Sequence, residues 1–393
     1  MNDFFDLLQP ARDKKRIIKT IASIPSNYIG SKRRLLSHIW DVVYDYDIDC
    51  DTVFDTFSGG GMVSLLFKHM GKNIITNDIL TASSLTAVSL LQNSKIPITD
   101  SEINFLCTNV PEDYPTFTTD NYQDKFFTKK ECDLLDRYRK NVEILYGQSF
   151  YKGDNIHDRH NNPKDDNGYK SAFALFLILS HVSQHCFLGG RYYNGQIIAQ
   201  LQHRLQHQKN QGKDITKFDI ESERFKNVLL DGDARVFNED IINLLHHKTV
   251  TADLIYIDPP YGGGSSDYTK LYGFLEEYLY GASVDDLKHL KQGSKRYCQN
   301  KNYQLQLESL LSLCGDFPSW MLSYNESSFA DLDTITSIIK NAGRKDIQVS
   351  QVPITYQYRK GKNRVDTDHF QESYCNEGHK YLQRGTEYLI VAR

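Results

Sequence analysis

The segment Asp258-Pro259-Pro260-Tyr261 combines residue types that can bind an amino group. Proline has no backbone N–H and a fixed φ, so this corner rigidly presents the Asp258 carboxylate and the Pro259 carbonyl as acceptors without donors. Two acceptors suit the two hydrogens of an exocyclic base amine, and they stabilise the charge that develops as its nitrogen attacks an electrophile. Tyr261 adds a flat surface on which a base that has left its duplex can stack. The less favoured interpretation is a turn that merely ends a strand.

A glycine-rich turn and an acidic residue indicate a ligand that contains a nucleoside. The turn runs from Ser58 to Gly61, and glycines let the backbone approach a ligand closely. Ser64 stands where a G-x-G-x-x-G pattern needs its third glycine, which disfavours a dinucleotide. Asp78 ends the next apolar run, where a carboxylate can accept both hydroxyls of a ribose. An Asx turn that ends the strand explains Asp78 equally well.

Three apolar segments are predicted to form the strands that position these residues. Apolar runs at 52–57, 73–76 and 252–257 each end in a polar or glycine-rich turn, and the first two lead into stretches suited to helices. Apolar runs without alternation are typical of parallel strands that are buried on both faces. The sequence therefore predicts an α/β fold with a doubly wound, Rossmann-like sheet, whose ligands bind beyond the carboxyl ends of the strands.

Residues 101–225 lack this pattern of apolar runs that end in turns, and they are expected to form an inserted, mainly helical subdomain. Helices are predicted at 127–146 and 169–186. Residues 1–100 and 226–393 would then form the catalytic domain. The segment 167–213 contains lysines, arginines and histidines but no acidic residue, so it can meet phosphates, although a solvated surface is an equal alternative.

Composition excludes several classes of protein. The chain has 393 residues, of which 40% are hydrophobic and 24% charged, as in a globular protein. It has no apolar stretch of the ~20 residues that a membrane helix needs and no secretory signal, so we expect a cytoplasmic protein that is independent of membranes.

The seven cysteines include no C-x-x-C pair. Two histidine pairs with i,i+4 spacing, His181/His185 and His203/His207, have no third ligand signalled, so no metal is expected.

Four ordered motifs together resemble the amino-group DNA methyltransferases, specifically the Dam-like adenine-N6 enzymes of the alpha group. Tyr28-Ile29-Gly30-Ser31-Lys32 is similar to the aromatic-x-G-x-K motif of that family, and Phe57-Ser58-Gly59-Gly60-Gly61 to its F-x-G-x-G motif. Asn77-Asp78 is similar to the ribose-binding acid, and Asp258 to Tyr261 match D-P-P-Y. The order of the motifs, with an insertion before D-P-P-Y, is that of the alpha group.

The resemblance implies S-adenosylmethionine as the cofactor and assigns roles by position. The implied catalytic residues are Asp258, Pro259, Pro260 and Tyr261. The implied cofactor-binding residues are Tyr28, Gly30, Lys32, Asp55, Phe57, Gly59, Gly61, Asp78, Asp233 and Asp258. Asp233 matches the third motif, which implies that it accepts from the adenine amine of the cofactor; a turn-forming aspartate is the equal alternative. Arg191, Tyr192 and Asn194 match the skeleton of a loop that the family uses against DNA, with an exposed turn as the competing interpretation.

The resulting hypothesis is a site-specific enzyme that transfers methyl from S-adenosylmethionine to N6 of an adenine flipped out of double-stranded DNA. It acts either in restriction-modification or as an epigenetic methylase. A cognate restriction endonuclease is a candidate partner, and a monomer suffices for the reaction. Methylation of cytosine N4 is one alternative, because both amines suit the same acceptors. A regulatory module that binds S-adenosylmethionine without chemistry is another.

Overall fold

The computed structural model describes residues 13–25, 28, 30–94, 98–147, 165–186, 205, 214–218, 220–261, 268–283, 286–287, 290, 300–326, 328–359, 373–376 and 380–393. Within these residues, no helix is long and apolar enough to cross a membrane.

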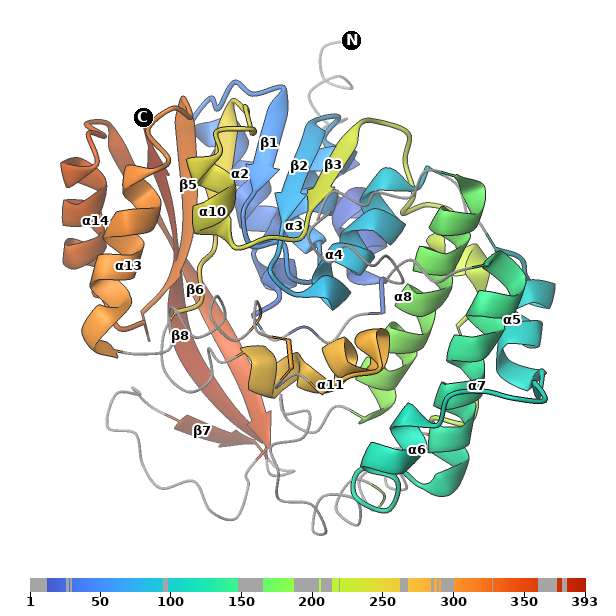
Figure 1. Cartoon of the computed structure of the whole chain (residues 1–393). Coiled ribbons are helices and arrows are strands. Elements are labelled where there is room, and N and C mark those ends of the chain that lie inside the picture. The colour runs from blue at the N-terminus through green and yellow to red at the C-terminus, as the bar shows by residue number, and fades with distance from the viewer. Residues whose placement is uncertain are drawn as a thin grey trace, which may run out of the picture.

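A mixed sheet forms the centre of the described structure (Figure 1). Its strands are β1 (Thr52–Asp55), β2 (Asn73–Asn77), β3 (Ala234–Phe237), β4 (Leu254–Ile257), β5 (Ser319–Asn325), β6 (Ile347–Arg359), β7 (Ser373–Asn376) and β8 (Lys380–Ala392). They lie in the order β3-β2-β1-β4-β5-β8-β6, with β7 paired to β8. Strands β1 to β5 are parallel, and β8 is antiparallel to its neighbours. The strand order reverses direction between β1 and β4, which makes their carboxyl ends the expected place for a ligand.

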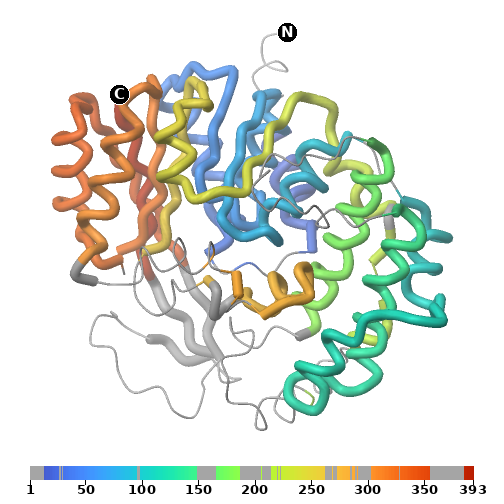
Figure 2. Tube along the Cα trace, in the orientation of Figure 1, coloured from blue at the N-terminus to red at the C-terminus, as the bar shows by residue number. Residues whose placement is uncertain are grey.

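Helices cover both faces of this sheet (Figures 1 and 2). They are η1 (Lys32–Arg34), α2 (Leu36–Asp45), α3 (Met62–His69), α4 (Thr81–Ala87), the π-helical turn η2 (Val88–Gln92), α5 (Asp100–Thr108), α6 (Phe117–Tyr122), α7 (Lys129–Tyr146), α8 (Asp166–Cys186), η3 (Ser222–Phe225), α10 (Ile241–His246), α11 (Tyr268–Tyr280), α13 (Asn300–Ser312) and α14 (Leu332–Asn341). Side chains from α2, α3, α4, α7, α8 and α11 share one hydrophobic core, whereas those from α10, α13 and α14 share the other.

The buried strands explain why the apolar runs lack alternation. In β4, Leu254 and Tyr256 belong to the first core, while Ile255 and Ile257 belong to the second. Because both faces are covered, apolar side chains are favoured at successive positions of this strand. The predicted α/β fold is confirmed. The edge strand β6 was not predicted, since Pro353 interrupts its pattern and proline argues against a strand.

The helices predicted at 127–146 and 169–186 are confirmed as α7 and α8. Helix α7 begins at Lys129 because the preceding Thr128 forms a capping box with Glu131. Residues of both helices belong to the same core as β1, so these helices extend the core of the sheet.

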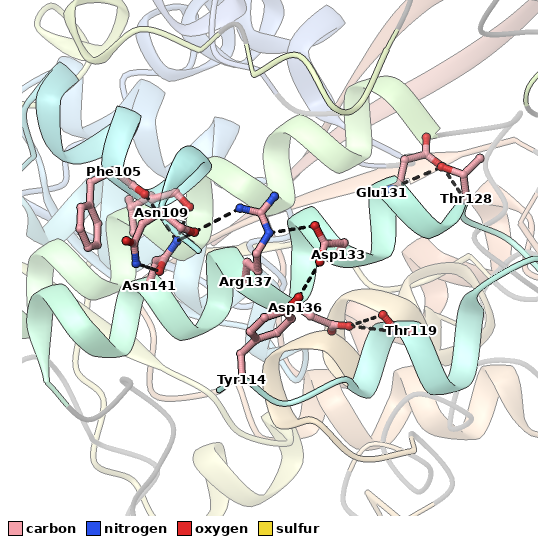
Figure 3. A network of polar contacts seen from close by, with 11 residues as sticks. Phe105, Asn109, Tyr114, Thr119, Thr128, Glu131, Asp133, Asp136, Arg137 and Asn141 are labelled. Carbon is pink, nitrogen blue, oxygen red and sulfur yellow. Dashed lines mark hydrogen bonds and ion pairs between the residues drawn. The ribbon is translucent and has the colours of Figure 1, made fainter. Parts of the chain in front are cut away.

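Polar side chains join α5, α6 and α7 to one another (Figure 3). The Asp136 carboxylate of α7 accepts hydrogen bonds from the backbone N–H groups of Thr118 and Thr119 at 2.8 and 2.9 Å, and so caps the first turn of α6. The Asn141 amide of α7 donates to the carbonyl of Leu106 at the end of α5, over 3.0 Å. These bonds satisfy backbone groups at helix termini that would otherwise lack partners.

Candidate active site

The glycine-rich turn and the diproline corner lie side by side at the reversal point of the sheet. In the parallel pairing of β1 with β4, Asp55 is the partner of Tyr256. Both the backbone N–H and the hydroxyl of Thr56 donate to the carbonyl of Tyr256, over 3.1 and 2.9 Å. The two segments that sequence analysis selected are therefore joined directly where β1 and β4 end.

Asp258 forms an ion pair with Lys32 at this corner. The Lys32 ammonium lies 2.8 Å from Asp258 Oδ2, and the Tyr261 hydroxyl donates to Asp258 Oδ1 over 2.8 Å. Only 7% of the Lys32 side chain and 15% of the Asp258 side chain are exposed. The expectation of a corner that offers acceptors alone is therefore corrected: each carboxylate oxygen already accepts one bond, and one lone-pair direction remains on each.

Lys32 and Tyr261 also contact each other. The Lys32 ammonium lies 4.9 Å from the centre of the Tyr261 ring, a cation–π arrangement. Burial and the neighbouring Asp258 carboxylate raise the pKa of the Tyr261 phenol, so this hydroxyl stays protonated and continues to donate. The Tyr261 carbonyl accepts from the backbone N–H of Phe329 over 3.1 Å, which fixes the end of the corner.

Asp78 lies at the carboxyl end of the neighbouring strand β2 and holds the glycine-rich turn. Its Oδ2 accepts from the N–H of Gly59, and its Oδ1 accepts from the N–H of Leu80, each over 2.8 Å. Burial raises the pKa of Asp78 from 3.8 to about 6, and these backbone bonds oppose the rise. The carboxylate is thus held in one orientation and retains lone pairs for a further donor.

Asp55 lies between these two carboxylates and is more deeply buried. Its Oδ2 accepts from the Ser64 hydroxyl over 2.6 Å, and the carboxylate also interacts with the backbone N–H of Phe57. Burial is the main reason that the pKa of Asp55 rises from 3.8 to about 7; the Ser64 bond opposes this, and the charges of Asp258 and Asp78 add to it. Three carboxylates with one lysine give this edge of the sheet an excess of negative charge, which suits a cationic ligand.

Tyr28 covers the glycine-rich turn. Its ring stacks on that of Tyr272, with centroids 4.7 Å apart and planes inclined by 6°. A Cβ atom built on Gly59 would lie only 2.6 Å from Tyr28 Cε1, and Gly59 has a φ of +50°. Glycine is therefore required at this position for both space and backbone conformation.

If this turn binds the cofactor that the resemblance implies, replacing Gly59 with alanine is expected to weaken that binding about tenfold or more, because either the Tyr28 ring or the backbone must move. Isothermal titration with S-adenosylmethionine measures the effect. Gly71→Ala is the matched control, since Gly71 also has a positive φ but no atom near its missing Cβ. Equal affinities for Gly59→Ala and the wild type would contradict the assignment of Gly59.

The remaining implied cofactor residues lie around the same turn. The Gly30 carbonyl accepts from the Lys32 ammonium over 3.2 Å. Gly61 has a left-handed conformation at the N-cap of α3, and its N–H donates to the Ser58 carbonyl over 2.7 Å. Phe57 packs against the core on the α10 face of the sheet.

Asp233 does not join this group. It precedes Ala234, the first residue of β3, so it is exposed at the amino end of that strand, whereas Asp78 and Asp258 follow the carboxyl ends of β2 and β4. The expectation that Asp233 accepts from the cofactor is corrected on this ground. Asn238 follows the carboxyl end of β3, and its amide donates to the carbonyl of Asp78 over 2.9 Å.

Several implied residues lie outside the described part of the chain. These are the candidate DNA-contacting residues Arg191, Tyr192 and Asn194 and the histidines His203 and His207. His181 is fully buried in α8, where one ring nitrogen lies 2.9 Å from the carbonyl of Ile215.

Sequence reasoning missed the contribution of α11. Tyr272, Glu276 and Tyr280 are spaced four residues apart on this helix, and they contact Tyr28 and the start of α4. That spacing indicates one face of a helix and was the available signal. It does not indicate what the face contacts.

Comparison with known proteins identifies the family of this chain. A family model described as "D12 class N6 adenine-specific DNA methyltransferase" matches residues 28–346. A Type II methyltransferase of Haemophilus parahaemolyticus, M2.HphI, is 28% identical over 349 residues, covering 86% of this chain and 94% of the relative. M.FokI of Planomicrobium okeanokoites is 26% identical and modification methylase LlaI of Lactococcus lactis subsp. lactis 24%, over 90% and 80% of this chain. The chain spans only about half of these two longer relatives, 52% and 48%. The match over most of the chain shows that it belongs to the D12 class of N6 adenine-specific DNA methyltransferases.

Proposed function

We propose that this enzyme uses S-adenosylmethionine to methylate N6 of an adenine flipped out of double-stranded DNA, as the modification enzyme of a Type II system. The family assigns adenine N6, in preference to cytosine N4 or to a module without chemistry. Its relatives are named as Type II methyltransferases and modification methylases, which supports the role in modification. A cognate endonuclease is the partner that this role implies.

The arrangement of Lys32, Asp258 and Tyr261 beside the Asp78 turn carries the proposal. The carboxylates suit S-adenosylmethionine, which is cationic at its sulfonium and contains a ribose. The buried carboxylates of Asp55 and Asp78 support a positively charged ligand in particular. Asp78 and the backbone of Gly59 would hold the nucleoside, while Asp258 would border both the cofactor and the base.

The residues of the corner account for the chemistry. When bound, S-adenosylmethionine would supply a methyl group by in-line displacement: the bond from N6 to the methyl carbon forms as the bond from sulfur to that carbon breaks, S-adenosylhomocysteine leaves, and N6 releases one proton to solvent. Asp258 and the Pro259 carbonyl accept from the two hydrogens of the amine and so orient its lone pair. Lys32 pairs with the Asp258 carboxylate and holds it in place, and Tyr261 offers its ring to the base. The lysines, arginines and histidines of the segment 167–213, which contains no acidic residue, would meet the phosphates of the duplex.

The direct test is transfer of labelled methyl from S-adenosylmethionine to double-stranded DNA, followed by digestion to nucleosides. We expect label in N6-methyldeoxyadenosine. Label in N4-methyldeoxycytidine would support the cytosine alternative, and cofactor binding without transfer would support the regulatory module. Sequencing modified bases in DNA from cells that express the chain would identify the target site.

The affinity for S-adenosylmethionine should fall as the pH is lowered from about 8 to about 6. Asp55 and Asp78 have pKa values raised to about 7 and about 6, so they take up protons in this range, and a cationic ligand must displace them. The ligand-free protein should behave oppositely. Its folded state binds more protons than its unfolded state between pH 4 and about 7, so the free energy of unfolding declines as pH rises through that window.

Isothermal titration across this range measures the pH dependence of binding. Asp55→Asn is the control variant, since it removes the group that titrates near pH 7 and should flatten the upper part of the profile. Identical profiles for this variant and the wild type would exclude Asp55 as the source.

A further inference from the structure

We infer that Glu276 is a positioning residue for cofactor binding, acting through residues 78–82, which we call the cofactor turn. This inference rests on the proposed function, because it assumes that Asp78 holds the nucleoside. Glu276 lies in α11 and has no exposed surface. Its Oε2 accepts from the N–H of Thr81 over 3.0 Å and its Oε1 from the N–H of Ala82 over 2.8 Å. One carboxylate from a distant helix therefore holds both N–H groups at the start of α4.

These bonds replace a cap that α4 lacks in its own sequence. The N-cap residue is Leu80, which has no side chain that can accept a hydrogen bond. The N–H groups of the first turn have no partner within a helix, and leaving them buried and unpaired is costly. Because the N–H of Leu80 binds Asp78 and the next two bind Glu276, consecutive amides of the turn are held by two carboxylates.

The carbonyl groups of the cofactor turn are held as well. The Asn238 amide donates to the carbonyls of Asp78 and Ile79 over 2.9 and 3.0 Å. The Thr81 hydroxyl lies 2.9 Å from the Tyr280 hydroxyl of α11. Carboxylates bind the amides of the turn and Asn238 binds its carbonyls, so the backbone of the turn fixes the orientation of the Asp78 carboxylate.

Helix α11 is itself held in place by contacts with its neighbours. Glu276 can cap α4 only if the helix that carries it is fixed. On the side away from Glu276, the Tyr278 hydroxyl donates to the carbonyl of Leu135 in α7 over 2.8 Å. Phe274 packs edge-on against Tyr122 of α6, with ring centres 5.0 Å apart. One turn before Glu276, Tyr272 stacks on Tyr28. Figure 1 shows α11 beside α4, between the sheet and the helices α6 to α8.

Burying the charged Glu276 carboxylate costs free energy, and the hydrogen bonds that it accepts offset this cost. Burial raises the pKa of Glu276 to about 7, and the nearby charge of Asp78 adds to the rise, whereas the bonds from Thr81 and Ala82 lower it. A buried carboxylate is tolerated only when it is well hydrogen-bonded. An apolar side chain would fill the space at less cost but would leave the two amides unpaired.

The test is Glu276→Gln, which keeps the size of the side chain but turns an NH2 group towards one of the backbone N–H groups. We expect the KM and the dissociation constant for S-adenosylmethionine to rise about tenfold. The kcat at saturating cofactor should stay within about twofold of the wild type, and so should the KM for DNA, because the turn acts on binding.

Asp136→Asn is the matched control, because Asp136 caps α6 by the same pair of amide bonds, away from the cofactor turn. Both variants should melt at a lower temperature, but only Glu276→Gln should bind the cofactor more weakly. Normal cofactor affinity in Glu276→Gln, or an equal loss in Asp136→Asn, would overturn the inference. Failure of the wild type to bind S-adenosylmethionine would instead refute the proposed function.

A milder variant tests whether α11 holds the cofactor turn if Glu276→Gln does not fold. Tyr280→Phe removes only the hydroxyl that contacts Thr81. A rise of about two- to threefold in the cofactor KM with unchanged kcat supports the role of α11 in holding the turn. An unchanged KM would count against it.

Discussion

Replacing Asp258 with alanine is expected to reduce methyl transfer to DNA adenine by at least about 10²-fold while leaving a folded protein, because preorganised polar groups at a reacting centre are typically worth that much. The variant removes the proposed acceptor for the amine, and it also removes the partner of Lys32 and of the Tyr261 hydroxyl. Initial rates of label transfer at saturating DNA and cofactor measure the loss.

Asp258→Asn separates the role of charge from that of shape. Asparagine keeps one oxygen that can accept from the amine or from Tyr261, but its NH2 group cannot accept, and the charge that pairs with Lys32 is lost. We expect this variant to be nearly as inactive as Asp258→Ala and to be better packed. A folded Asp258→Ala enzyme with near-normal methylation would refute the assigned role of the corner.

Much of this site could be predicted because its chemistry follows strand ends. Asp78 and Asp258 each end a buried apolar run, and parallel strands bring their carboxyl ends to one edge of the sheet. The order of the strands was not needed for that expectation. The contact between Lys32 and Asp258 was beyond reach, since no local pattern places an N-terminal lysine on a corner far along the chain.

Asp233 shows where reasoning from spacing fails. Asp233 was assigned from its match to the third motif of the family, and the apolar run Val228-Leu229-Leu230 before it is compatible with a strand that ends there. The strand instead begins at Ala234, after the turn, so the aspartate lies at the opposite edge from the site. A short apolar run on each side of a turn leaves the position of the strand open, and only the pairing of β3 with β2 decides it.

The contribution of α11 was unpredictable for a different reason. The four-residue spacing of Tyr272, Glu276 and Tyr280 indicates a helix face, but a buried glutamate is unusual, so this face resembles a solvated one in sequence. What makes it buried is the free first turn of α4, which belongs to another part of the chain. Tertiary partners of this kind are not encoded in local periodicity.

Replacing Lys32 with methionine is expected to lower both stability and methyl transfer, because it leaves the Asp258 carboxylate near Asp55 and Asp78 without its cation. Removing one partner of a buried pair costs about 3–5 kcal/mol. We expect a loss of about 3 kcal/mol or less in the free energy of unfolding, since 15% of the Asp258 side chain is exposed. Methyl transfer should fall at least about tenfold, because the carboxylate is no longer fixed.

The double variant Lys32→Met/Asp258→Asn separates these two effects. It buries no uncompensated charge, so urea unfolding should show a large part of the lost stability restored relative to Lys32→Met. Methyl transfer should stay as low as in Asp258→Asn, because the double variant also lacks the carboxylate that we propose accepts from the amine. If the double variant is instead no more stable than Lys32→Met alone, the instability comes from lost packing around the lysine side chain, and the ion pair is not what holds the corner. If transfer recovers together with stability, then Asp258 acts only through the fold, and its assignment as the acceptor for the base amine is wrong.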